Sequence, residues 1–403
     1  MDKGPAYKQM IAQTAKSASL ELRTLSSEVR NAALQKIAAS IRANEAKIIE
    51  ENLRDIEAAK AGGMSGYMID RLTLNSKRIE EMAAGVEEIA AFADPLGKVL
   101  ESRALKNGIA LSRVSVPLGA ILFIYESRPN VTIDGAALCF KAGNAVILRG
   151  GKESVHSSSF LAKIFCDVLP EFGISKSAVQ YVDNPDRNLL AELLKQSSYL
   201  DLVIPRGGEG LIRAVSEQSK IPVIKHFNGI CHVYIDKSAD SEKAAAILFN
   251  SKVQRPSVCN AAETVLFHKD LPKEAVEQIL KPLKEAGVEL HYDKCGTEYL
   301  DLQISVCFVE NVKEACEHIE CHGSHHTDAI VAEDPETIEY FANNVDSSSV
   351  MLNASTRFAD GGQYGLGAEV GISTDKLHAR GPMGVESLCS YKWVLKGNGQ
   401  IRM

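Results

Sequence analysis

The sequence lacks the features of membrane, secreted and nucleic-acid-binding proteins. No stretch approaches the roughly 20 apolar residues that span a bilayer, and the start, Met1-Asp-Lys-Gly-Pro, has no apolar core of a signal peptide. The 45 Lys and Arg residues are scattered among 52 Asp and Glu residues, and the net charge of -7 gives no support to binding of nucleic acid or of an anionic membrane. We therefore expect a cytoplasmic protein without a membrane or nucleic-acid partner.

Regular cysteine spacing is also missing. The nine cysteines are an odd number, and they lie between Cys139 and Cys389 without regular pairing distances. This pattern argues against a disulfide framework and favours a reducing compartment.

Length and hydrophobic pattern indicate several domains. A chain of 403 residues exceeds what one hydrophobic core usually supports, so we expect two or three domains. Apolar residues at helical spacing dominate the chain before the first strands, and from Pro117 onward strand-like and helix-like segments alternate. Such alternation predicts a parallel sheet covered on both faces. A second region of this kind begins after a boundary at about Asn228-Gly229.

A β-hairpin is predicted between the helical and the alternating regions. The β-prone runs Val99 to Lys106 and Ile109 to Val116 flank Asn107-Gly108, the dipeptide that best suits a tight turn. The edge of a long hairpin needs a partner. The C-terminal run from Tyr391 to Leu395 alternates large apolar and basic residues, and we expect it to pair with this edge from another subunit.

The glycine fingerprint of dinucleotide-binding proteins, G-x-G-x-x-G, is missing after the first strand of the alternating region. Glycines follow a later strand instead, where Gly207 and Gly208 precede a predicted helix. Backbone N–H groups at such a helix start are able to hold a pyrophosphate. A mere turn is the alternative interpretation.

Two cationic residues, Arg149 and Lys152, follow the second strand of this region. In dinucleotide-binding domains an acidic residue there favours NAD, whereas cations suit the 2′-phosphate of NADP. Glu153 has the opposite charge, and a solvated loop is the alternative.

Cys259 is the candidate nucleophile. It lies between a basic loop that contains a proline and an apolar strand. Lys252 and Arg255 are close enough in sequence to favour the thiolate, which a cysteine nucleophile needs near neutral pH. The alternative is a small buried cysteine that caps a strand.

Several long segments of the chain are similar to those of one known family. The segments are Tyr125-Glu-Ser-Arg-Pro-Asn-Val-Thr132, Gly143-Asn-Ala-Val-Ile-Leu-Arg-Gly-Gly151, Gln254-Arg-Pro-Ser-Val-Cys-Asn260, Asn353-Ala-Ser-Thr-Arg-Phe358 and His378-Ala-Arg-Gly-Pro-Met-Gly384. Together, and in the same order along the chain, they resemble the gamma-glutamyl phosphate reductases. This family, also called glutamate-5-semialdehyde dehydrogenases, belongs to the aldehyde dehydrogenase superfamily, and the likeness covers nearly the whole chain.

The resemblance implies an α/β fold of the aldehyde dehydrogenase type, with two Rossmann-like parallel-sheet domains and a β-hairpin flap for oligomerisation. Residues 1–97 and 118–228 are the expected cofactor-binding domain, to which 357–384 returns. Residues 229–356 are the expected catalytic domain, and 98–117 with 385–403 form the expected flap.

The resemblance also implies NADPH-dependent reduction of L-glutamate 5-phosphate to L-glutamate 5-semialdehyde and phosphate through a cysteine thioester, the second step of proline biosynthesis from glutamate. Aldehyde-oxidising members of the superfamily carry a glutamate in an E-L-G-G motif as the base for thioester hydrolysis. The corresponding segment here is His226-Phe-Asn-Gly229, so we expect hydride rather than activated water to attack the thioester. An aldehyde-oxidising NAD(P)-dependent dehydrogenase and a catalytically silent NADP-binding regulator are the alternatives.

Single residues receive roles from the same resemblance. Cys259 is the expected nucleophile, with its backbone N–H and Asn130 as oxyanion donors. The expected ligands of the substrate's anionic groups are Arg128, Arg255, Arg357 and Arg380. The expected NADP-binding residues are Arg149 and Lys152 at the adenosine ribose, Gly207 and Gly208 at the pyrophosphate, and Glu298 at the nicotinamide ribose.

We expect no metal. The segment from Cys316 to His326 contains enough Cys and His residues for zinc, but the spacing is irregular for a closed four-ligand site, and an expected helix from Val312 to Glu320 separates the faces. The expected partners are the small-molecule substrate, glutamate 5-kinase and further copies of this chain in a homo-oligomer.

Overall fold

The computed structural model describes residues 5–402 except 127, 185 and 293. Helices and strands alternate over most of this part, and the strands form sheets of three, six, two and four strands. The predicted α/β class is confirmed. None of the described helices combines the length and the hydropathy that crossing a membrane requires.

The chain forms two compact units. Unit 1 contains Met1–Ile224, Leu366–Gly371 and Met383–Met403, and unit 2 contains Lys225–Gly365 and Ile372–Pro382. The expectation that all of 357–384 returns to the first domain is wrong, because most of this segment belongs to unit 2.

Local bonds explain why this segment stays with unit 2. The short strands β13 (Ile372–Ser373) and β14 (Gly381–Pro382) pair with each other, and between them Asp375 accepts a hydrogen bond from the backbone N–H of Lys225 at 3.1 Å. Thr374 also donates its N–H to the Lys225 carbonyl at 3.2 Å.

Unit 1 begins with helices whose apolar faces are buried. They are α1 (Pro5–Leu22), α2 (Ser27–Ala43), α3 (Glu45–Ala61), α4 (Gly66–Leu72) and α5 (Ser76–Ala91). In α2, Leu34, Ile37 and Ile41 are fully buried, as their spacing predicts. The Ser26 side chain caps α2 by accepting from Val29 N, which satisfies one of the free N–H groups of the first turn.

A parallel sheet follows in unit 1, in the order β5-β4-β3-β6. Its strands are β3 (Ala120–Tyr125), β4 (Ala145–Arg149), β5 (Val179–Tyr181) and β6 (Leu202–Arg206), and its helices are α6 (Asn130–Lys141), α7 (Val155–Val168), α8 (Arg187–Leu193) and α9 (Glu209–Gln218). Every residue of β3 is buried, which fits a central strand covered on both faces. The register aligns Ile124 with Arg149 and Tyr125 with Arg206, so these strands end at one edge.

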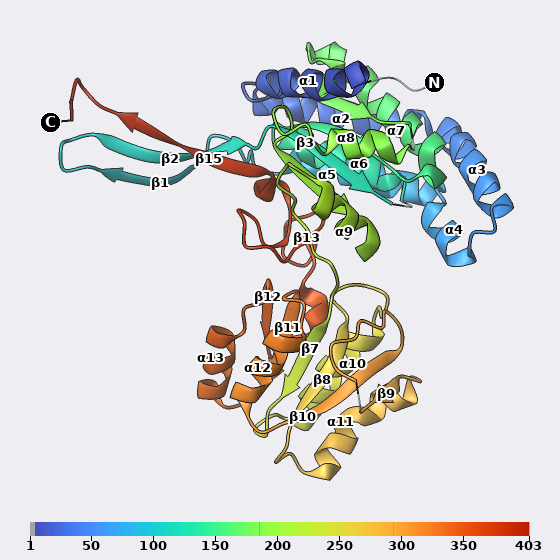
Figure 1. The fold of residues 1–403 in the computed structure, drawn as a ribbon, viewed down its shortest axis with the longest axis vertical. Coiled ribbons are helices and arrows are strands. Elements are labelled where there is room, and N and C mark those ends of the chain that lie inside the picture. The colour runs from blue at the N-terminus through green and yellow to red at the C-terminus, as the bar shows by residue number, and fades with distance from the viewer. Residues whose placement is uncertain (1–4, 127, 185, 293, 403) are drawn as a thin grey trace. The chain divides into compact units, whose positions relative to one another are not determined.

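A three-stranded antiparallel sheet, here called the arm, extends from the helices of unit 1 (Figure 1). It consists of β1 (Val99–Ala104), β2 (Ala110–Pro117) and β15 (Cys389–Lys396). The predicted hairpin is confirmed, and Gly108 in its turn has the left-handed φ of 81° that favours glycine. The expectation that the C-terminal strand comes from another subunit is wrong, because β15 pairs with β2 of the same chain.

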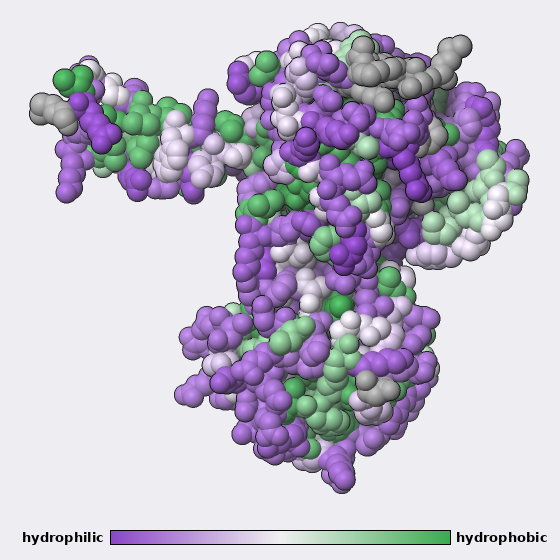
Figure 2. Space-filling view, in the orientation of Figure 1, coloured by the Kyte–Doolittle hydropathy of each residue, from purple (hydrophilic) through white to green (hydrophobic). Residues whose placement is uncertain are grey.

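The arm carries large apolar side chains that remain exposed. Figure 2 shows hydrophobic residues gathered along it. The exposed ones include Val99, Leu100, Tyr391, Trp393, Val394 and Leu395. Contiguous exposed apolar residues of this kind are typical of a surface that binds another protein.

Unit 2 contains a parallel sheet in the order β12-β11-β7-β8-β10-β9. Its strands are β7 (Cys231–Ile235), β8 (Ala262–His268), β9 (Glu289–His291), β10 (Gln303–Val309), β11 (Thr327–Val331) and β12 (Ser349–Leu352), and its helices are α10 (Ser241–Val253), α11 (Lys273–Glu285), α12 (Val312–His322) and α13 (Pro335–Asn344). The second alternating region is thereby confirmed. Because all six strands run the same way, the segments that precede them meet at the amino edge of the sheet.

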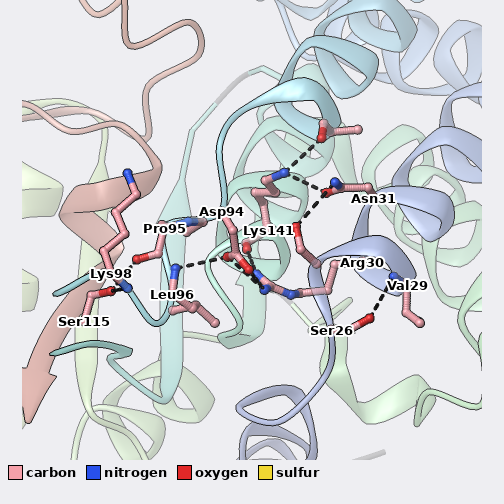
Figure 3. Close-up of polar contacts among 12 residues, drawn as sticks. Ser26, Val29, Arg30, Asn31, Asp94, Pro95, Leu96, Lys98, Ser115 and Lys141 are labelled. Carbon is pink, nitrogen blue, oxygen red and sulfur yellow. Dashed lines mark hydrogen bonds and ion pairs between the residues drawn. The ribbon is translucent and has the colours of Figure 1, made fainter.

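A buried guanidinium connects three segments of unit 1 (Figure 3). The Arg30 side chain is 1% exposed, and it donates to the Asp94 carboxylate at 2.8 Å and to the Lys141 carbonyl. The Lys141 ammonium in turn donates to Asn31 Oδ1 at 2.6 Å and to the Ala90 carbonyl at 2.9 Å. Helices α2 and α6 and the segment after α5 are thus held by a network of charged hydrogen bonds.

We predict that Arg30→Ala lowers the free energy of unfolding by about 2–4 kcal/mol, because it leaves the Lys141 carbonyl buried without its donor and removes the partner of Asp94. Urea unfolding measures this change. The matched control is Lys36→Ala, which breaks an exposed ion pair with Glu171 and should change stability by less than about 1 kcal/mol. Equal effects of the two substitutions would contradict a structural role for the buried guanidinium.

Candidate active site

Cys259 lies in the turn that joins α10 to β8, at the amino edge of the sheet of unit 2. Helix α10 ends at Val253, before Pro256, whose ring cannot continue a helix. The turn closes with a 3.0 Å hydrogen bond from Ala261 N to the Val258 carbonyl. Cys259 is half-buried there, so it occupies a turn rather than the interior of the strand.

Two histidines that received no role in the sequence analysis lie beside Cys259. His226 precedes β7 and His326 precedes β11, and the order β11-β7-β8 brings both to the turn. One nitrogen of each ring and the Cys259 Sγ all lie within 4.8 Å of one another. The His226 Nδ1 is 2.9 Å from the Ile372 carbonyl, which only accepts, so Nδ1 carries the proton and Nε2 has a lone pair.

His326 is fully buried and uncharged. Burial and, to a lesser extent, the neighbouring His226 lower the pKa of its imidazole to about 3. The rings of these two histidines meet edge-on, with centroids 5.5 Å apart, and the His326 Nδ1 is 2.9 Å from the Thr327 hydroxyl. The thiol therefore has a neutral imidazole beside it at physiological pH.

Gly229 touches the backbone of the nucleophile. A Cβ added there would lie 1.9 Å from the Cys259 carbonyl oxygen and 2.6 Å from its Cα, so only glycine fits. Gly229 N donates to the Glu298 carboxylate at 2.7 Å, and the Cys231 thiol donates to the Cys259 carbonyl at 3.2 Å. The segment matched with E-L-G-G thus lies against the nucleophile, which places its first residue, His226, near the thiol.

Lys252 does not have its expected effect on the thiol. Its ammonium donates to Glu263 at 2.7 Å, and both side chains are 0% exposed. Burial lowers the pKa of Lys252 and raises that of Glu263 to about 7, while each charge opposes the shift of the other. The prediction that Lys252 supports the thiolate of Cys259 is wrong, because its charge is committed to a buried partner.

Of the four predicted substrate arginines, Arg255 and Arg357 share the neighbourhood of Cys259. Burial lowers the pKa of Arg357. The charges of Asp360, Arg255 and Cys259 also act on this pKa, so these groups lie close to Arg357. Arg357 Nε also donates to Gln254 Oε1 at 2.7 Å, which holds it against the loop before Cys259.

The other two arginines lie elsewhere. Arg380 belongs to unit 2 and donates to the Asp346 carboxylate and carbonyl, both at 2.6 Å. Arg128 lies just before α6 in unit 1, together with Asn130, the predicted oxyanion donor. The Asn130 amide donates to Asp134 Oδ2 at 2.9 Å, and its role toward the substrate stays a prediction.

Four of the predicted cofactor residues share the carboxyl edge of the sheet of unit 1. Arg149 ends β4, Lys152 follows it in a short 3-10 helix, and Gly207 and Gly208 separate β6 from α9. Burial lowers the pKa of the Arg149 guanidinium, and Lys152 is exposed.

The start of α9 holds a carboxylate in the structure. Gly208 N donates to Glu126 Oε2 at 2.9 Å, and a Cβ at Gly207 would lie 2.4 Å from the same oxygen. The N–H group of Gly208 and the absence of a side chain at Gly207 together form a binding place for an anionic oxygen. A phosphate of a dinucleotide fits there once the Glu126 side chain moves away. The sequence analysis did not single out Glu126. Glu298, the fifth predicted cofactor residue, lies in unit 2 beside Gly229.

Comparison with known proteins agrees with this arrangement. The sequence profile of the aldehyde dehydrogenase family matches residues 4–297. A gamma-glutamyl phosphate reductase of Idiomarina loihiensis is 49% identical over 97% of this chain and 98% of its own. Among solved structures, the gamma-glutamyl phosphate reductase of Thermotoga maritima is 39% identical with a TM-score of 0.96, over 98% of this chain and all of its own, and that of Saccharomyces cerevisiae is 35% identical with a TM-score of 0.57, over 98% of each.

We predict that Gly229→Ala lowers the free energy of unfolding by at least about 2 kcal/mol, because the new Cβ collides with the Cys259 backbone, which cannot rotate away. Displacement of that backbone should also slow alkylation of Cys259 by iodoacetamide, measured by mass spectrometry of its peptide. Gly85→Ala is the matched control, since nothing lies within 4 Å of the added Cβ. It should stabilise α5 by up to about 1 kcal/mol and leave Cys259 unchanged.

His326 should make stability depend on pH. Its pKa of about 3 in the folded protein lies below the ordinary 6.5. As the pH falls, His326 therefore binds a proton in the unfolded chain before it does so in the folded protein. The stability that is present above pH 6.5 is lost as the pH falls toward 3. The slope contributed by this residue is at most about 1.4 kcal/mol per pH unit. We predict that His326→Gln flattens the fall in unfolding free energy between about pH 6.5 and about pH 5, measured with urea. An unchanged slope would contradict the buried neutral imidazole.

Proposed function

Because the chain belongs to the aldehyde dehydrogenase family, whose members use NAD or NADP, we propose that it reduces L-glutamate 5-phosphate to L-glutamate 5-semialdehyde and phosphate with NADPH. This is the second step of proline biosynthesis from glutamate. Relatives at 46–49% identity over nearly the whole chain carry the name gamma-glutamyl phosphate reductase. The observation that supports this chemistry most directly is the half-buried thiol of Cys259 with Arg255 and Arg357 in its neighbourhood.

The reaction divides into two steps at one sulfur. The Cys259 thiolate attacks the acyl carbon, the bond to the phosphate oxygen breaks, and phosphate leaves with that electron pair, which gives a thioester. NADPH, which Arg149, Lys152, Gly207 and Gly208 would hold, would supply the hydride that reduces the thioester carbon. The tetrahedral product then collapses to the semialdehyde and returns the electron pair to sulfur, which regains the thiolate.

His226 is the base that we assign to the thiol. Its Nε2 lone pair is set by the bond of Nδ1 to the Ile372 carbonyl, and one of its ring nitrogens lies within 4.8 Å of the Cys259 Sγ. Proton transfer from sulfur to nitrogen forms the nucleophile, and the imidazolium then faces the departing phosphate. The buried His326 also has a ring nitrogen within 4.8 Å of the thiol, and it is neutral, so it does not compete as a cation.

The arginines bind the anionic groups of the substrate. Arg255 is exposed and Arg357 is half-buried, so together they offer guanidinium groups at two depths of one site. Guanidinium forks suit both phosphate and carboxylate. Arg128 and Arg380 complete the proposed set, with Arg380 released from Asp346 when the substrate binds. The oxyanion donors are the backbone N–H of Cys259 and the amide of Asn130.

NADPH is the proposed form of the cofactor. Arg149 and Lys152 supply the charge that suits a 2′-phosphate at the carboxyl edge of the sheet of unit 1. Gly207 and Gly208 cradle the pyrophosphate in place of the Glu126 carboxylate. Glu298 accepts from Gly229, which touches Cys259, and we assign it to the nicotinamide ribose near the reacting sulfur.

The proposal also concerns the cellular compartment, the oligomeric state and the protein partner of the enzyme. The nine cysteines form no disulfide in the described part of the chain, which suits the cytoplasm. The exposed apolar residues of the arm support assembly of further copies of this chain into a homo-oligomer. Glutamate 5-kinase, which makes the labile acyl phosphate, is the proposed protein partner.

One observation favours a second function, the hydrolytic oxidation of an aldehyde. His226 occupies the place of the E-L-G-G glutamate and lies close enough to the thiol to activate water. The two functions differ in their need for phosphate, which makes them separable in one assay.

The test is the reverse reaction, in which pyrroline-5-carboxylate, NADP and phosphate are mixed and the nicotinamide absorbance is followed. We predict that more than one equivalent of reduced cofactor per chain forms only with phosphate, and that Cys259→Ala lowers the rate at least about 1000-fold because it removes the nucleophile. The matched control, Cys321→Ala, removes an exposed thiol of α12 and should leave the rate unchanged.

Turnover without phosphate would identify a hydrolytic dehydrogenase. Binding of NADP without any turnover would identify a silent regulator. The same assay with NAD in place of NADP tests the cofactor, and a loss of preference for NADP in Arg149→Ala would support the proposed contact with the 2′-phosphate.

A further inference from the structure

A second group of cysteine and histidine side chains lies in unit 2, on other elements than the Cys259 group. Cys295 lies in the loop between β9 and β10, Cys307 lies on β10, and His318 lies on α12. The two sulfur atoms and one nitrogen of the His318 ring all lie within 4.8 Å of one another, and the two Sγ atoms are 3.2 Å apart. The reaction proposed above uses none of these side chains.

The donors match those that zinc prefers. Two thiolates and one neutral imidazole form the soft and borderline set that selects zinc over magnesium or calcium. Zinc–sulfur bonds of about 2.3 Å in a tetrahedral site place two sulfurs about 3.8 Å apart, so the Cys295 and Cys307 side chains need to separate by only about half an ångström. Both sulfurs remain reachable from solvent, since Cys295 is exposed and Cys307 is half-buried.

His318 is held in place by other imidazoles. Its ring lies between those of His232 and His322, at centroid distances of 5.5 and 4.6 Å. His232 is itself fixed by a 2.8 Å bond from Nδ1 to Asp328 Oδ1 in the buried sheet. Within the described part of the chain, the buried Nε2 of His318 has no hydrogen-bond partner. A buried ring nitrogen without a partner is costly, and coordination of a metal would satisfy it.

We propose that Cys295, Cys307 and His318 form a zinc-binding site with an open fourth position. The sequence analysis expected no metal, and it considered only the cysteines and histidines between Cys316 and His326. Of these, only His318 takes part. The other two ligands come from a strand and a loop that precede α12 in the chain, so the spacing within the helix gave no signal of the site.

A metal ion at this position would tie down the loop that reaches the active site. Cys295 lies three residues before Glu298, which accepts from Gly229 N, and Leu300 N donates to the buried Glu263. Hydrogen bonds of Glu298 and Leu300 therefore already fix the C-terminal part of this loop, and zinc bound to Cys295 would fix its N-terminal part. The inference of a zinc site itself does not depend on the proposed function.

The test is zinc binding by the full chain, reduced and freed of metal, in competition with a chromophoric chelator. The Cys259→Ala variant is the background, because it removes the thiol shared by His226 and His326. We expect one zinc ion per chain, release of two protons from the thiols, and a thiolate-to-metal charge-transfer band when cobalt replaces zinc. Cys295→Ser, Cys307→Ser and His318→Ala should each weaken binding by at least about 10-fold to 100-fold.

The matched control is Cys321→Ser, an exposed thiol on the same helix as His318, which should bind zinc as the background does. A second measurement needs no substitution in the site: zinc should slow alkylation of Cys295, followed by mass spectrometry of its peptide. Equal zinc affinity in the background and in Cys295→Ser, or unchanged alkylation of Cys295, would overturn the proposal. Formation of a Cys295–Cys307 disulfide without zinc binding would also overturn it and would identify a redox pair.

Discussion

The ion pair between Lys252 and Glu263 is the constraint on which the candidate active site depends. Lys252 lies at the end of α10 and Glu263 at the start of β8, so the pair spans the turn that carries Cys259. Both side chains are fully buried, and loss of either would leave a charge in the interior, which typically costs about 3–5 kcal/mol. The second oxygen of the same carboxylate accepts from Leu300 N at 3.1 Å. One buried group thereby fixes the nucleophile turn and the loop that carries Glu298.

Backbone contacts connect the loop that carries Glu298 with the turn that carries the Cys259 thiol. Glu298 accepts from Gly229 N, and Gly229 packs directly against the Cys259 backbone. The Lys252 charge thus serves the structure, and the arginines Arg255 and Arg357 and the neutral imidazole of His326 lie near the sulfur. Such surroundings suit a thiol that must form a thioester with an anionic acyl group.

The sequence contained enough information for the local elements and for the position of the candidate nucleophile. The alternating strands and helices, the hairpin around Gly108 and the position of Cys259 outside its strand all depend on short-range patterns, and the structure confirms them. Such short-range patterns do not predict which distant segments of the chain contact each other. The role of Lys252 was misjudged because its burial against Glu263 decides it, and the place of residues 372–382 was misjudged because Asp375 bonds to Lys225, 150 positions away.

The positions of His226 and His326 near Cys259 were likewise not predictable from short-range patterns. His226 and His326 are 100 positions apart, and only the strand order β11-β7-β8 brings them to one thiol. Cys295, Cys307 and His318 likewise come from a loop, a strand and a helix. The one sequence signal for His226 was its place in the segment matched with E-L-G-G. That comparison noted the missing carboxylate but not the base that stands there.

The most direct test of the account is the mass of the protein after it is mixed with pyrroline-5-carboxylate and NADP in the absence of phosphate. The account predicts one equivalent of reduced cofactor and a glutamyl thioester on the peptide that contains Cys259, which persists until phosphate is added and then disappears. Continued turnover without phosphate and without any adduct on Cys259 would contradict a thioester on Cys259 that only phosphate releases.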